Sequence, residues 1–136
     1  MTHFLDTNVL LYAVSTHDGE EEKRARAEAL LDRDGGALSI QVLGEFYAQA
    51  TRPLGPAHLS HEPAVGFIRT WRRFRVQAVT LALFDATLAI KAVHGFSYWD
   101  SVIVAVARAL GCTTLYTEDL SHGRQVEGVI SINPFR

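Results

Sequence analysis

One stretch decides how this chain can fold: HFLDTNVLLYA, residues 3–13. Its apolar run at 3–5 ends in Asp6, Thr7 and Asn8, and an apolar helical pattern follows at once. This order predicts a buried strand that leads directly into a helix. Asp6 then lies at the carboxyl end of the first strand, where open α/β sheets bind their ligands. A carboxylate in that place needs either a helix-capping role or a cation to offset its lost solvation.

Length and composition indicate a single globular domain, residues 1–136. Hydrophobic residues make up 48% of the chain and charged residues 21%, which is typical of a protein with a folded core. The net charge of -2 excludes a strong overall positive field for nucleic acid. Cys112 has no second cysteine to pair with, and no signal peptide is evident, so we expect a cytoplasmic protein. No apolar run reaches the ~18 residues that cross a bilayer, so we expect no membrane association.

Segments with strand and helix patterns alternate along the rest of the chain. Predicted strands follow the first one at 37–40, 76–81, 113–116 and 129–132. Predicted helices lie at 9–13, 20–32, 41–51, 62–74, 86–93 and 99–110, with Asp85 as a cap and a loop at 54–61. This alternation predicts an α/β fold of three layers, in which helices cover both faces of a mostly parallel five-stranded sheet.

Four acidic residues lie where a solvated side chain is not expected: Asp6, Glu45, Asp100 and Asp119. Asp6 and Asp119 follow predicted strands, and Asp100 opens the most apolar helix. The carboxyl ends of parallel strands and the starts of the helices that follow them meet at one edge of a sheet, so these three can come together there. Glu45 lies among apolar residues of its own helix.

Each of these acids also has a purely structural explanation. Ser97 and Asp100 form a capping box, Glu45 suits the exposed side of an amphipathic helix, and Asp119 can begin a turn. One metal site explains all four acids at once, because Mg²⁺ and Mn²⁺ prefer oxygen ligands. Without a cation, clustered carboxylates would repel and raise one another's pKa.

The motifs that carry these acids resemble those of a known family. They are Asp6-Thr7-Asn8 after the first strand, Glu45 at the end of SIQVLGE (39–45), Asp100 in YWDS (98–101), Asp119 in TED (117–119), and the closing INPF (132–135). Together they resemble a PIN domain, and the whole chain resembles the VapC-type toxins of bacterial toxin–antitoxin pairs.

The resemblance implies a specific activity and site. It implies an endoribonuclease that depends on Mg²⁺ or Mn²⁺, hydrolyses phosphodiester bonds with metal-activated water, and is paired with an antitoxin protein. It carries Asp6, Glu45, Asp100 and Asp119 over as the catalytic, metal-binding acids. It suggests Thr7, Asn8 and Thr117 as supporting polar residues. Glu118 is expected to face away from Asp119, because neighbours in an extended segment point to opposite faces.

RNA has to be held by positive charge, and an oligomer could complete its path. The spacing of Arg69, Arg72 and Arg73 puts them on one face of a helix, although a solvated face explains them equally well. Phe46, Tyr47 and Trp99 exceed the apolar area that one small sheet needs. Simple core packing explains these residues equally well, and the family resemblance implies a homodimer that also binds a partner peptide.

Three other functions fit parts of the pattern. A receiver-type phosphoacceptor domain has a similar size and an acidic Mg²⁺ pocket, but it needs a late-strand lysine. Lys23 and Lys91 both precede the last two strands, which counts against that function. A PIN fold that only binds partners would not need all four acids. A nuclease of routine RNA processing remains an alternative to the toxin, and a short upstream gene for a DNA-binding protein would favour the toxin.

Overall fold

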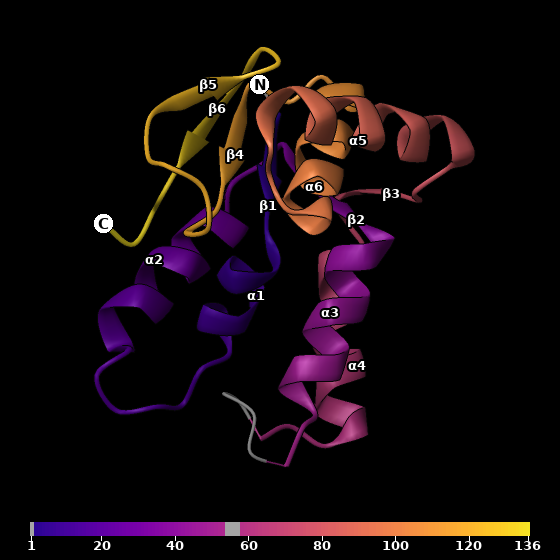
Figure 1. Cartoon of the computed structure of the whole chain (residues 1–136). Coiled ribbons are helices and arrows are strands. Elements are labelled where there is room, and N and C mark those ends of the chain that lie inside the picture. Colours follow the sequence, from indigo (N-terminus) through magenta and orange to yellow (C-terminus); the bar gives the residue numbers. More distant parts are fainter. Residues whose placement is uncertain (1, 54–57) are drawn as a thin grey trace.

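In the part of the chain that the structure describes, the sheet has six strands, of which five run parallel. The computed structural model describes residues 2–53 and 58–136, so residues 54–57 of the predicted loop lie outside it (Figure 1). The strand order is β3-β2-β1-β4-β6-β5, and only β5 runs antiparallel, to β6. The predicted α/β fold with a mostly parallel sheet is thus confirmed. The strands are β1 (His3–Leu5), β2 (Gly36–Ser39), β3 (Arg75–Gln77), β4 (Thr114–Tyr116), β5 (Arg124–Val126) and β6 (Val129–Ile132).

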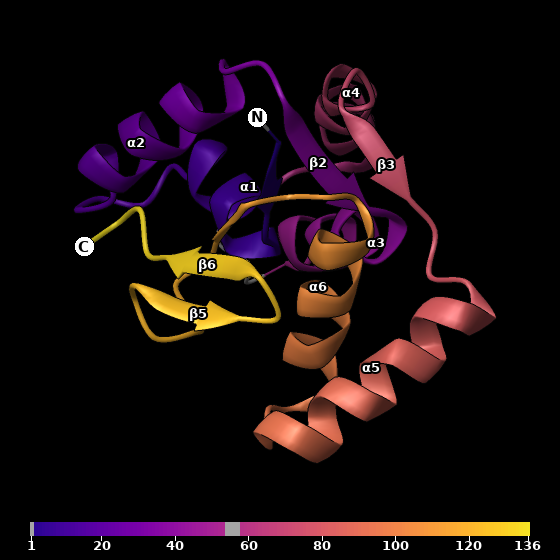
Figure 2. The same cartoon turned by 90° about the horizontal axis from the view of Figure 1, so that it is seen from above.

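Helices cover both faces of the sheet, as Figure 2 shows. Helices α1 and α2 pack against each other on one face, and α5 and α6 pack against each other on the other. Helices α3 and α4 lie side by side and extend beyond the carboxyl edge of the sheet (Figure 1). The bounds are α1 (Thr7–Ala13), α2 (Glu21–Leu31), α3 (Ile40–Ala50), α4 (His61–Trp71), α5 (Leu81–His94) and α6 (Tyr98–Ala109).

The core extends over both faces of the sheet, and among the described helices α6 has the longest buried stretch. Phe4 and Leu5 of β1 are fully buried, and all residues from Ser101 to Ala107 of α6 are buried. Successive residues of a helix point to different sides, so this stretch has to be covered by several neighbouring elements, and α6 contacts α5, β2, β4 and β6. In the described ranges, none of the helices is long and apolar enough to cross a membrane.

The prediction of five strands was wrong because it missed β5. This strand forms a hairpin with β6 through Glu127 and Gly128, whose φ angles are 53° and 82°. Two successive positive φ angles are typical of the tight hairpin turn that fits the twist of a sheet. The Glu127 carboxylate also accepts hydrogen bonds from His94 Nε2 (3.2 Å) and Arg108 Nη1 (3.1 Å), which ties the turn to the helices.

The predicted strand at 76–81 and the predicted helix at 86–93 were also misplaced. Strand β3 ends at Gln77, and α5 begins at Leu81. Thr80, and not Asp85, is the N-cap, since its Oγ1 accepts a hydrogen bond from the Leu83 amide at 3.2 Å. Threonine and aspartate are both good N-cap residues, so the sequence alone did not tell the two possible helix starts apart. The β-branched residues just before α5 continued the strand pattern, and the predicted strand was therefore too long.

Candidate active site

Asp6 and Thr117 directly follow two neighbouring strands and lie next to each other at the end of the pair. Strands β1 and β4 pair in parallel with Leu5 opposite Tyr116, so the next residues, Asp6 and Thr117, emerge side by side. The Thr117 hydroxyl donates a hydrogen bond to Asp6 Oδ2 at 2.7 Å, and the Thr7 amide donates to Asp6 Oδ1 at 2.6 Å. Asp6 is therefore the N-cap of α1 and is almost fully buried. The capping role does not account for its second oxygen, which Thr117 holds.

Glu45 reaches the same place from α3. Helix α3 follows β2, and Ser39 caps it by accepting a hydrogen bond from the Val42 amide at 3.1 Å. Thr7 Oγ1 donates to Glu45 Oε2 at 3.0 Å, and Gln41 Nε2 donates to Glu45 Oε1 at 3.1 Å. Glu45 is half-buried, so the alternative of a solvated helix position does not describe it.

Asp119 and Asp100 complete the group from the loop after β4 and the start of α6. The Asp119 amide donates to Thr117 Oγ1 at 3.0 Å, and Asn8 Nδ2 donates to Asp119 Oδ2 at 3.4 Å. Ser97 Oγ accepts from the Asp100 amide at 3.1 Å, which is the capping half of the predicted box. This bond uses the Asp100 backbone and leaves its carboxylate facing the other acids.

All four predicted acids line one cavity, which we call the acidic cleft. Its volume is about 270 Å³, and Glu118 supplies a fifth carboxylate. None of the side chains that line it in the described part of the chain is a lysine or arginine. In the described part of the chain, the four predicted acids form no salt bridge, and Lys23 lies near Glu118. Its lining consists of Asp6, Thr7, Asn8, Leu11, Glu45, Gln49, Trp99, Asp100, Ile103, Glu118 and Asp119.

Burial raises two pKa values in the acidic cleft, and the neighbouring carboxylates add to the rise. Burial raises the pKa of Asp6 from 3.8 to about 7; Asp119 and Glu45 add to the rise, and the hydrogen bonds from Thr117 and Thr7 oppose it. The pKa of Asp119 is raised by partial burial and by the charges of Asp100, Glu118 and Glu45, against the hydrogen bond from Asn8. Asp119 thus interacts electrostatically with acids from three other elements.

The donor set of the cleft fits a hard divalent cation. Among the described residues, no three acidic, histidine or cysteine side chains are close enough together to hold one ion by themselves. Mg²⁺ does not require such a cage, because it usually keeps several waters and binds through one or two carboxylates. The raised pKa values of Asp6 and Asp119 show that their ionised forms are unfavourable in the cleft. A bound cation would stabilise these ionised forms, because an opposite charge nearby favours a carboxylate.

Glu118 contradicts the expectation that it faces away from Asp119. Both side chains line the cleft, because the chain bends after Tyr116 and no longer alternates as a strand does. The Tyr12 hydroxyl donates to both Glu118 oxygens at 3.1 Å. Gln49 and Trp99 also line the cleft and were not predicted there. Trp99 immediately precedes Asp100 in the first turn of α6, and this adjacency is the one sequence signal that places it at the cleft.

The three predicted arginines lie elsewhere. Arg69 is exposed on α4, and Arg72 lines a groove between α3 and α4. The Arg73 guanidinium donates to the carbonyls of Leu31 and Thr70 and lies near the amino end of β2. The structure therefore does not bring them to the cleft. Phe46, predicted for a dimer contact, is fully buried and packs edge-on against Trp71 in the core.

Fold and cleft together define an α/β domain with an acidic site at the carboxyl edge of a parallel sheet. The sequence profile described as PIN domain matches residues 3–125, so the chain belongs to the PIN domain family. Comparison with curated proteins finds no match.

Several solved structures share this fold. VapC20 of Mycobacterium tuberculosis, described as a sarcin–ricin loop cleaving toxin, is 26% identical over 87% of this chain and 90% of its own, with a TM-score of 0.68. A toxin–antitoxin complex from Klebsiella pneumoniae is 16% identical over 98% of both chains, with a TM-score of 0.72. VapBC2 of Rickettsia felis, bound to a promoter DNA fragment, is 18% identical over 96% of this chain and 97% of that chain, with a TM-score of 0.65.

Proposed function

We propose that this protein is an endoribonuclease that depends on Mg²⁺ or Mn²⁺ and hydrolyses RNA phosphodiester bonds in the acidic cleft. The observation that carries the proposal is the convergence of Asp6, Glu45, Asp100 and Asp119 on one cavity without a lysine or arginine in its described lining. RNA is polyanionic, so such a site needs a cation before a phosphate can enter. A receiver-type function has no support, since no described lysine lines the cleft.

The side chains of the cleft have distinct tasks in this proposal. Asp6, Glu45, Asp100 and Asp119 would hold the cation, one or two of them directly and the others through its waters, and the cation would activate water and neutralise charge on the phosphoryl oxygen. Thr117 fixes Asp6 through its hydroxyl and fixes the Asp119 backbone through its oxygen. Thr7 orients Glu45, and Asn8 orients Asp119. These bonds keep the carboxylates close together despite their repulsion.

We propose that the nuclease is the toxin of a toxin–antitoxin pair and acts in the cytoplasm. The support is the likeness to VapC20 and to solved toxin–antitoxin complexes. An antitoxin protein would then be the second partner besides RNA. Two effects on cells distinguish a toxin from a nuclease of routine RNA processing. Expression of the routine nuclease would not arrest growth. Co-expression of a neighbouring small gene would then change nothing, whereas an antitoxin gene would relieve the arrest caused by a toxin.

We further propose a homodimer that forms through α5. Leu81, Phe84 and Leu88 are 77%, 39% and 45% exposed, and their spacing places them on one stripe of the helix. Trp99, 57% exposed, lies at the start of α6, the helix that packs on α5. An exposed apolar stripe of this kind is typical of an interaction surface. Sedimentation should detect dimers at micromolar concentration, and a strict monomer would contradict the proposal.

Brief expression followed by sequencing of new RNA ends tests the nuclease function in cells. The wild-type chain should arrest growth and create ends at a limited set of sites. Asp100→Asn should do neither, while Asp85→Asn, the same change at an exposed position of α5, should behave as the wild type does. New ends in the Asp100→Asn cells at the wild-type sites would exclude the acidic cleft as the source.

A further inference from the structure

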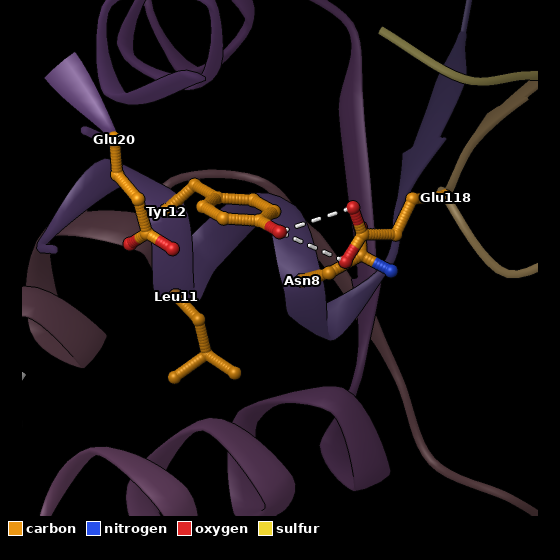
Figure 3. A pocket seen from close by; sticks show the side chains of 5 residues that line it. All are labelled: Asn8, Leu11, Tyr12, Glu20 and Glu118. Carbon is orange, nitrogen blue, oxygen red and sulfur yellow. Dashed lines mark hydrogen bonds between the residues drawn. The ribbon is translucent and has the colours of Figure 1, made fainter. Parts of the chain in front are cut away.

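A second, smaller cavity opens beside the acidic cleft. Asn8, Leu11, Tyr12, Glu20 and Glu118 line this side pocket, which has a volume of about 160 Å³ (Figure 3). Asn8, Leu11 and Glu118 also line the acidic cleft, so the two cavities share a wall. A ligand that is processed in the cleft therefore has a neighbouring part within reach of the side pocket. Tyr12 and Glu20 belong to the side pocket alone.

The polar wall of the side pocket presents hydrogen-bond acceptors. Asn8 donates through its amide nitrogen to the Asp119 carboxylate, and its Oδ1 is buried behind the wall, so the acceptors at the pocket surface are the carboxylates of Glu20 and Glu118. The Glu20 carboxylate accepts from the Ser15 hydroxyl through Oε1. A carboxylate accepts through two oxygens, so Glu20 retains acceptor capacity at Oε2.

The Tyr12 hydroxyl is a hydrogen-bond donor in the side pocket, and it already has partners. The Tyr12 hydroxyl donates to Glu118 and accepts a hydrogen bond from Lys23 Nζ at 3.3 Å. Figure 3 shows the Tyr12 hydroxyl turned towards the Glu118 carboxylate. The ring of Tyr12 and the side chain of Leu11 supply apolar surface beside these acceptors. The side pocket therefore combines apolar contact with carboxylate oxygens that can accept further hydrogen bonds, and Lys23 lies near its Tyr12 side.

We propose that the side pocket binds the base of the nucleotide next to the scissile phosphate, and that it prefers a base with an exocyclic amino group. Single-stranded RNA is recognised by proteins through splayed bases that make apolar contacts and hydrogen bonds along their edges. Adenine, cytosine and guanine carry exocyclic amino groups that can donate to the Glu20 carboxylate. Uracil has no amino group, and its single N3–H lies between two carbonyl oxygens, which a carboxylate repels. The inference rests on the ribonuclease function proposed above.

Other ligands fit the side pocket less well. A phosphate group would be repelled by the carboxylates of Glu20 and Glu118, since a like charge at short range is unfavourable. A hydrated cation would gain nothing from the Leu11 side chain, and Lys23 Nζ already lies 4.9 Å from the centre of the Tyr12 ring. A neutral, flat base with amino donors satisfies both parts of the wall.

The test is the cleavage of a random-sequence RNA pool by the purified protein, with sequencing of the ends. The wild type should show a preference of about fivefold or more against uracil at one position next to the cut, which is the lower end of discrimination by base-edge hydrogen bonds. Glu20→Gln, which introduces an amide donor, should weaken this preference. Glu20→Lys, which offers only donors, should reverse it towards uracil. Preferences at the other positions should not change.

Controls separate this proposal from the one it rests on. Glu62→Gln, the same change at an exposed position of α4, should keep the wild-type preference, and melting curves should show that every variant is folded. If the wild type cuts no RNA with Mg²⁺ or Mn²⁺, the ribonuclease function itself is wrong. If it cuts and the Glu20 variants keep the wild-type preference, the side pocket does not read a base. If the Glu20 variants keep the wild-type preference but bind the antitoxin more weakly, the side pocket contacts the antitoxin and not a base of the RNA.

Discussion

Replacing Asp6 by asparagine should stabilise the metal-free protein at neutral pH. Asp6 is 3% exposed, and its burial raises its pKa from 3.8 to about 7. Folding therefore favours the protonated carboxyl group over the ionised one. Because the folded-state pKa is raised, the wild type keeps its full stability below the unfolded-state pKa and loses stability as the pH rises from about 4 to about 7.

The magnitude follows from the two pKa values. One pKa unit corresponds to about 1.4 kcal/mol, so a rise from 3.8 to about 7 lowers the free energy of unfolding by on the order of 4 kcal/mol above pH 7. Asparagine does not titrate and avoids this loss. It weakens the hydrogen bond from Thr117, which costs about 1 kcal/mol at every pH. The variant should thus be slightly less stable than the wild type near pH 4 and more stable above pH 7.

Urea unfolding in chelator, at fixed ionic strength and at several pH values, measures this difference. Titrating groups that do not interact with Asp6 cancel when the two proteins are compared at each pH, and Asp85→Asn controls for an exposed site. Parallel pH profiles of wild type and Asp6→Asn would refute the reasoning. Magnesium adds a second comparison: with an assumed Kd of ~1 mM, ~10 mM Mg²⁺ should stabilise the wild type by about 1.4 kcal/mol and the variant less.

Three further predictions concern other parts of the molecule. Asp119→Asn should slow RNA cleavage more than Glu118→Gln, because the Glu118 carboxylate already accepts hydrogen bonds from Tyr12. Initial cleavage rates measure this difference, and the reverse order would make Glu118 the more important acid. Phe46→Ala should lower the free energy of unfolding by about 3–5 kcal/mol, since it empties a fully buried site; a loss below about 1 kcal/mol in urea unfolding would contradict that packing. Phe84→Glu should yield monomers in sedimentation, and an unchanged dimer would place the interface elsewhere.

The part of the fold that positions the site could be predicted from local pattern. An apolar run followed by Asp6 and a helical pattern indicates a buried strand with a polar end, and both β1 and β4 have this form. Parallel pairing then brings Asp6 and Thr117 together without further information. The four acids were recognisable because each interrupts an apolar segment.

The remaining parts depend on contacts that a local pattern does not contain. Two of the three residues of β5 are exposed, so its hydrophobic signal is weak, and the Glu127-Gly128 turn is stabilised by distant His94 and Arg108. Glu118 enters the cleft because the chain bends after β4 and Tyr12 of α1 binds it. The side pocket likewise combines α1, the residue before α2 and the loop after β4, so its residues carry no shared motif.

The cleavage rate of a labelled single-stranded RNA by purified protein tests the central claim most directly. The wild type and Asp85→Asn should cleave with Mg²⁺ or Mn²⁺, stop in chelator, and recover when the metal is restored. Asp100→Asn should remain folded and lose at least about a hundredfold in rate, because an amide binds the cation weakly and does not neutralise it. Cleavage that continues in chelator, or an Asp100→Asn rate equal to that of Asp85→Asn, would contradict a metal-dependent ribonuclease site in the acidic cleft.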